Sequence, residues 1–99
     1  MQLRTLAIED LAQVMDLERR LFQNEAWLEQ TMAAEITSPQ THYVGAFDGS
    51  LLGYAGLKVS GPSYSSDVQT IGVEPESQGK SIGRTLMNEL LAFAKRQGS

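Results

Sequence analysis

Apolar residues recur at helical spacing in the first part of the chain. Leu3–Leu6 predicts a short opening strand, and Asp10 then precedes an apolar row typical of a helix with one buried face. A second row, at intervals of four residues, predicts another helix, which Asn24 is expected to cap and Ser38-Pro39 to end. The two rows are Leu11, Val14, Met15, Leu21 and Phe22, and then Leu28, Met32 and Ile36.

From Thr41 onward the pattern becomes that of strands. Residues 41–47 and 51–59 are β-rich and are separated by Asp48-Gly49-Ser50, a hairpin signal. Residues 61–66 predict a loop, and residues 67–73 predict another strand. We expect one face of that strand to carry Val68, Thr70 and Gly72, and the other to carry Gln69, Ile71 and Val73.

A third helix is predicted after this strand. Its buried face would consist of Ile82, Leu86, Leu90, Phe93 and Ala94, with basic residues at its C-terminal end. The order is therefore strand, helix, helix, three strands, helix. This order predicts a mixed α/β (α+β) fold with a mainly antiparallel sheet flanked by helices.

The composition of the chain argues against several classes of partner and site. The chain has 99 residues, 41% hydrophobic and 20% charged, and its formal net charge is −4, so we expect no nucleic-acid partner. It shows neither a membrane-length apolar run nor the apolar stretch of a signal peptide, so no membrane partner and a cytoplasmic location are expected. Without cysteine there is no disulfide, thiol nucleophile or thiolate metal site, and no metal is predicted.

Residues 70–84 carry the most specific signal in the chain. A strand runs into a loop that contains Gly79 and Gly83, and the loop opens the third helix. Free main-chain N–H groups and the positive end of the helix dipole favour a phosphate or pyrophosphate there. Lys80 and Arg84 add positive charge, and no acidic residue lies between Gln78 and Arg84.

Two better-known phosphate loops do not fit this segment. Gly79-Lys80-Ser81 suggests a P-loop, but that motif requires glycine five positions before Gly79, where this chain has Glu74. The dinucleotide fingerprint G-x-G-x-x-G is absent as well.

The segment instead resembles the acetyl-CoA loop of the GNAT acetyltransferases, Q/R-x-x-G-x-G/A, which follows a strand that ends near V-x-P. Here the matching residues are Gln78, Ser81 and Gly83, after Ile71–Pro75. The order of elements is also similar, so the resemblance covers essentially the whole chain. Within this superfamily, Leu17–Phe22 followed by Trp27 is similar to the front of the ribosomal-protein alanine N-acetyltransferases.

The resemblance implies that acetyl-CoA is the acetyl donor, and it implies which residues would contact this cofactor. Main-chain groups of Ile71 and Val73, on either side of Gly72, would meet the pantetheine arm. Gln78 would frame the loop, and the pyrophosphate would lie on the N–H groups of Gly79, Lys80, Ser81, Ile82, Gly83 and Arg84. Ser81 departs from the pattern: serine strains the loop if the position needs a positive φ, but suits it if the position is a helix N-cap.

The implied reaction is direct attack of a primary amine on the acetyl thioester, and a ribosomal-protein N-terminus is one acceptor that the resemblance suggests. The resemblance implies that the family's domain continues beyond the third helix. In the alanine acetyltransferases that later region contains the glutamate proposed as general base and the tyrosine proposed as general acid. No position here matches either one, so no catalytic residue is assigned. We therefore expect residues 1–99 to form a single, C-terminally incomplete domain, with strand 67–73 as an open edge that favours self-association.

Several residues have an ordinary interpretation beside a functional one. His42 is expected to pack or lie at the surface, and Glu74 and Glu76 to solvate a loop rather than act as a base. Trp27 is expected to pack between helices rather than line a substrate groove. Tyr64 and Asp67 would contact substrate or only anchor their loop.

Three functions remain open on the sequence alone. The chain is an N-acetyltransferase domain, a non-catalytic acyl-CoA-binding or regulatory remnant of one, or a small interaction module in which the Gly79 loop is only a turn. Cofactor binding separates the last of these from the others, and turnover separates the first two.

Overall fold

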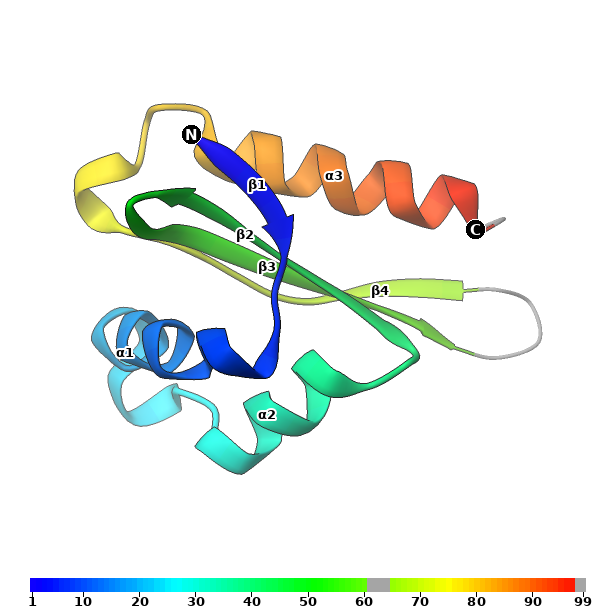
Figure 1. Ribbon diagram of the computed structural model, residues 1–99, viewed down its shortest axis with the longest axis horizontal. Coiled ribbons are helices and arrows are strands. Elements are labelled where there is room, and N and C mark those ends of the chain that lie inside the picture. Colours follow the sequence, from blue (N-terminus) through cyan, green and yellow to red (C-terminus); the bar gives the residue numbers. More distant parts are fainter. Residues whose placement is uncertain (61–64, 98–99) are drawn as a thin grey trace.

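The computed structural model describes residues 1–60 and 65–97, and its elements follow the predicted order (Figure 1). Short 3₁₀ turns occur at Ile8–Asp10 (η1), Gln23–Glu25 (η2) and Pro75–Ser77 (η3). The four strands form one antiparallel sheet in the order β1-β2-β3-β4. The strands and α-helices are β1 (Gln2–Thr5), α1 (Leu11–Phe22), α2 (Glu29–Thr37), β2 (Thr41–Asp48), β3 (Ser50–Ser60), β4 (Ser65–Val73) and α3 (Ile82–Arg96).

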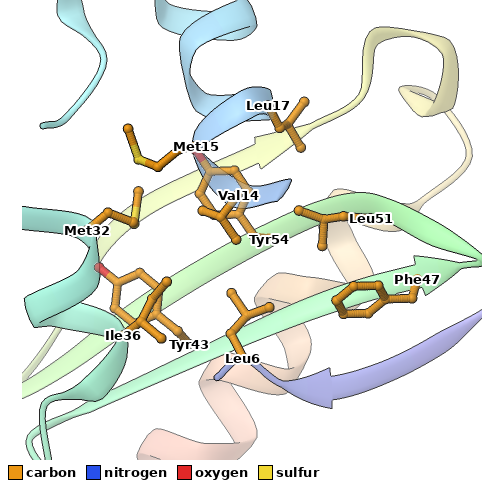
Figure 2. Packing of buried hydrophobic residues seen from close by; sticks show 10 residues of the cluster. All are labelled: Leu6, Val14, Met15, Leu17, Met32, Ile36, Tyr43, Phe47, Leu51 and Tyr54. Atoms are coloured by element: carbon orange, nitrogen blue, oxygen red, sulfur yellow. The ribbon is translucent and has the colours of Figure 1, made fainter. Parts of the chain in front are cut away.

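Helices cover both faces of the sheet: α1 and α2 lie on one side and α3 on the other (Figure 1). Figure 2 shows the first core, formed by Leu6, Val14, Met15, Leu17, Met32, Ile36, Tyr43, Phe47, Leu51 and Tyr54. The second core lies under α3 and consists of Val44, Ala46, Ala55, Leu57, Ile82, Leu86, Leu90 and Ala94. None of the helices in the described part of the chain has the length and apolar character needed to cross a membrane.

The connection between α1 and α2 differs from the prediction. Asn24 lies in η2 and does not cap the second helix, which begins at Glu29. Leu28 precedes that helix with extended backbone, at ψ 148°, and its side chain is 66% exposed instead of buried. Phe22, the last residue of α1, is 38% exposed. Both predictions of burial were wrong because the helical spacing is interrupted at Gln23, where φ is +49°.

A β-bulge in β4 overturns the predicted assignment of faces. Thr70 is paired with Gly56 and Val68 with Leu57, so Gln69 is the extra residue. The Tyr43 hydroxyl donates a 2.6 Å hydrogen bond to Oε1 of Gln69, which places that side chain with the core of α1 and α2. Ile71 and Val73 instead pack against the core under α3. Gln69 therefore does not share their face.

Glycines in the sheet allow two buried tyrosine rings to lie against the main chain. A Cβ at Gly56 would lie 2.1 Å from Cζ of Tyr43. A Cβ at Gly72 would lie 3.0 Å from Cε1 of Tyr54 and 2.9 Å from Cδ1 of Leu21. The end of α1 and the ring of Tyr54 consequently rest directly on β4.

Candidate functional site

The end of β4 presents main-chain groups along an open edge. In the described residues, β4 pairs with β3 alone. The amide of Glu74 donates to the carbonyl of Leu52 at 2.8 Å, and main-chain groups alternate sides along a strand. The N–H and C=O groups of Ile71 and Val73 therefore point away from β3, whereas those of Gly72 point toward it.

Gln78 folds the following loop back onto this edge. Its Nε2 donates a 3.1 Å hydrogen bond to the carbonyl of Val73, one of the outward-facing groups. This contact fixes the path of the loop, as the framing role inferred from sequence would require.

The loop reaches α3 through two residues with left-handed backbone. Gly79 has φ +86°, with nothing near the position of a Cβ. Ser81 has φ +66° and ψ +14° at the N-cap position of α3, but its side chain makes no capping hydrogen bond. Both alternatives for Ser81 are thus partly realised: it occupies the cap position, and its backbone costs about 1–2 kcal/mol for a residue other than glycine.

The first turn of α3 is bare at Gly83. A Cβ there would meet only Cγ2 of Val73, at 3.8 Å, which is ordinary van der Waals contact, and its φ is not positive. Neither packing nor backbone conformation requires glycine here, so the missing side chain is unexplained by the fold and suits close approach of a ligand. Ile82 is 5% exposed and anchors the helix in the core, so it offers only main-chain groups.

The same loop and the first turn of α3 contain two exposed cations. Lys80 and Arg84 are exposed, and within residues 1–60 and 65–97 neither forms an ion pair. In an acidic chain this makes the start of α3 a favourable place for an anion. Nowhere in the described residues do three His, Asp or Glu side chains gather as a metal site would require.

Glu74 is held by Arg20 and is a poor candidate for a base. Nη1 and Nη2 of Arg20 lie 2.8 and 2.6 Å from the two carboxylate oxygens of Glu74. These hydrogen bonds lower the pKa of Glu74, and a base that already has two strong donors accepts a proton from an amine poorly. Glu76 is exposed at the start of η3.

The ordinary interpretation also fits His42 and Trp27. The ring of His42 stacks on Phe93 with centroids 4.2 Å apart, and its Nε2 lies 3.0 Å from Oε2 of Glu89. Trp27 is partly buried against the core of α1 and α2. Asp67 is exposed on β4, and Tyr64 lies outside the described residues.

A buried carboxylate was not anticipated from the sequence. Glu18 is 1% exposed and accepts hydrogen bonds from the hydroxyl of Tyr54 and the main-chain N–H of Trp27. Burial, together with the hydrogen bond to Glu18, raises the pKa of the Tyr54 hydroxyl. A signal was present, because Glu18 stands four residues after Val14 and three before Leu21, on the apolar face of the helix.

Comparison with known proteins agrees with this arrangement. The profile of the acetyltransferase (GNAT) family matches residues 8–99. The N-alpha-acetyltransferase RimI of Mycobacterium tuberculosis is 43% identical over 90 residues, which cover 87% of this chain and 57% of that protein. The chain thus spans a little over half the length of this relative.

Solved structures share the fold. An aminoglycoside 6'-N-acetyltransferase complexed with coenzyme A superposes with a TM-score of 0.87 at 21% identity, over 99% of this chain and 57% of that one. The ribosomal-protein-S18-alanine N-acetyltransferase from Escherichia coli gives a TM-score of 0.84 at 21% identity, over 98% of this chain and 61% of that one. With the family profile covering nearly all of the sequence, the chain belongs to the acetyltransferase (GNAT) family.

Proposed function

We propose that this chain binds acetyl-CoA along the open edge of β4 and at the start of α3, for transfer of the acetyl group to a primary amine. The observation that carries the proposal is the bare first turn at Gly83, where a Cβ would lie 3.8 Å from Cγ2 of Val73, one of the residues whose main-chain groups point outward. Similarity to RimI, and the fold shared with an acetyltransferase that was solved with coenzyme A, support it.

Different residues of the chain would contact different parts of the cofactor. Ile71 and Val73 would pair with an extended amide-containing arm as an added strand does. The N–H groups from Gly79 through Arg84 would hold a pyrophosphate, except that of Lys80, which donates to the carbonyl of Ser77 at 3.3 Å. The charges of Lys80 and Arg84 would lie beside it. Since Gln78 already donates to the carbonyl of Val73, the arm would either share that carbonyl or displace the Gln78 amide.

Acetyl-CoA supplies an activated thioester, so the protein's task is to orient it beside the acceptor amine. We assign no general base in this chain, because the carboxylates of Glu74 and Glu18 are both engaged by strong donors. We propose that residues 1–99 form the cofactor-binding part of a single domain. A non-catalytic acyl-CoA-binding protein is the second candidate, because both of these carboxylates are engaged by donors.

We further propose a protein N-terminal α-amine as acceptor, a ribosomal protein being one example. Support comes from the names of similar proteins, RimI among them, and from the local similarity at Leu17–Phe22 and Trp27. An acetylation assay with peptides that begin with alanine, compared with the same peptides blocked at the N-terminus, tests this acceptor class.

Cofactor binding is tested by isothermal titration of the chain with acetyl-CoA. Gly83→Asp places a carboxylate where the pyrophosphate would lie, and we expect it to abolish binding. Asn88→Asp adds the same charge at an exposed position of the same helix, and it should leave binding intact. Equal binding by Gly83→Asp and the wild type would refute the proposed site, and no binding by the folded wild type would refute the function for this chain.

A further inference from the structure

One fully buried charged group has no part in the proposed cofactor site. Glu18 lies in the middle of α1, and its two carboxylate oxygens each accept one hydrogen bond, from Tyr54 Oη and from the N–H of Trp27 at 2.9 Å. Two donors and no acceptor suit an ionised carboxylate. Burying such a charge costs several kcal/mol before its partners compensate, and apolar replacements of buried polar networks are often no less stable. Stability alone therefore does not account for Glu18.

The Tyr54 side of this network leads to β4. Tyr54 points from β3 toward α1 (Figure 2), and the side chain of Thr70 on β4 lies close enough to its hydroxyl to oppose the rise in the pKa of Tyr54. The ring rests on the main chain of Gly72, where a Cβ would lie 3.0 Å from Cε1. Gly72 stands between Ile71 and Val73, the two residues whose main-chain groups face the open edge. A ligand bound along that edge would thus act on a strand that Tyr54 touches from one face.

The Trp27 side leads to the segment that joins α1 and α2. This segment contains η2 and then extended residues, with Ala26 at ψ 144° and Leu28 at ψ 148°. The N–H of Trp27 is bonded to Glu18, and the Trp27 side chain packs against the same core. Glu18 therefore connects β4, through Tyr54, with the position of this segment.

We propose that Glu18 is a positioning residue that couples the segment around Trp27 to β4, so that a ligand at the open edge of β4 shifts that segment. The inference rests on the proposed function, because it requires acetyl-CoA to bind beside Ile71 and Val73. It goes beyond that function by linking the cofactor strand to the segment that joins α1 and α2.

The chain contains a single tryptophan, so the emission of Trp27 reports directly on this segment. Acetyl-CoA is titrated into the chain while indole emission is recorded, with excitation where adenine does not absorb, and calorimetry is run in parallel. In the wild type we expect a saturable change in emission with the same midpoint as the heat.

The test variant combines Glu18→Met with Tyr54→Phe. Removing the Glu18 carboxylate together with the Tyr54 hydroxyl leaves neither of these two groups buried without the other, and the ring against Gly72 remains. The N–H of Trp27 loses its acceptor, which releases the segment from Glu18. We expect this variant to bind acetyl-CoA with an affinity close to that of the wild type and to lose the emission change. Thr70→Val interrupts the connection at its β4 end while Glu18 keeps both donors, and its emission change should be reduced even if the double variant fails to fold.

Tyr43→Phe is the matched control. It removes a hydroxyl from the neighbouring buried tyrosine, whose partner is Gln69, and leaves the Glu18 network intact, so the emission change should persist. An undiminished emission change in Thr70→Val or in a folded double variant that binds overturns the coupling. Heat without any emission change in the wild type also overturns it but leaves the proposed function standing. Absence of heat in the folded wild type overturns both.

Discussion

Substitution of Gly83 by alanine should change the stability of the fold and the affinity for acetyl-CoA in opposite directions. At a helical position, glycine is less favourable than alanine by roughly 0.5–1 kcal/mol. The added Cβ would meet only Cγ2 of Val73, at 3.8 Å, so no clash offsets this gain. The structure therefore predicts that Gly83→Ala stabilises the chain by up to about 1 kcal/mol.

For a domain of this size, 1 kcal/mol corresponds to a rise in melting temperature of roughly 4–8 °C. The same methyl group would stand in the bare first turn where we place the pyrophosphate, so affinity for acetyl-CoA should fall while stability rises. Thermal unfolding by circular dichroism measures the first quantity and isothermal titration the second.

Gly49→Ala is a useful control for this prediction. Gly49 lies in the β2–β3 turn with φ +76° and open space around it, so alanine should destabilise the chain there without changing affinity. If Gly83→Ala raised stability and left the affinity for acetyl-CoA unchanged, our interpretation of Gly83 would be refuted.

Three further outcomes follow from the structure. Ser81→Gly should raise stability by about 1 kcal/mol in urea unfolding because it relieves left-handed backbone, and no gain would contradict that conformation. The bidentate hydrogen bonds from Arg4 lower the pKa of Asp10, so this carboxyl stabilises the fold above its unfolded pKa and loses that effect as pH falls through its folded pKa. Asp10→Asn should therefore lower the melting temperature at neutral pH, by a margin that shrinks as the pH falls below the ordinary pKa of an aspartate, about 3.9. A margin independent of pH would count against the pair. The open edge of β4 should allow the chain to self-associate, as measured by sedimentation. Val68→Lys, at an exposed position of that strand, should weaken this association. A wild type that stays monomeric at high concentration would exclude self-association through the edge.

The sequence predicted the order of elements because apolar spacing is set by which residues face a core. Met32, Ile36, Ile82, Leu86, Leu90 and Ala94 are buried as their spacing indicated, and Phe93 is partly buried against the same core as the last four. The errors occur where the backbone leaves regular geometry. The bulge at Gln69 moves the side chains of Val68 and Gln69 to the faces opposite those predicted, and the break at Gln23 exposes Leu28.

The elements that carry the candidate site were predictable, but their local geometry was not. The sequence predicted a strand, a glycine loop and a helix start over residues 70–84, and the structure has β4, η3 and α3 in that order. The left-handed backbone of Ser81 was not predictable, because serine is equally typical of an ordinary N-cap. The partners of Glu18 and Glu74 were not predictable either, since they come from Tyr54 and Arg20, which are distant in sequence.

The most direct test of the account is a titration of isotopically labelled chain with acetyl-CoA, followed through its main-chain amide resonances by NMR. We predict saturable shifts concentrated at Ile71, Val73 and Gly79–Arg84, and their loss in Gly83→Asp. Saturable shifts centred elsewhere, such as the groove lined by Gln13, Asp16 and Ser50, would contradict the proposed site. A spectrum unchanged at saturating acetyl-CoA would contradict cofactor binding by this chain.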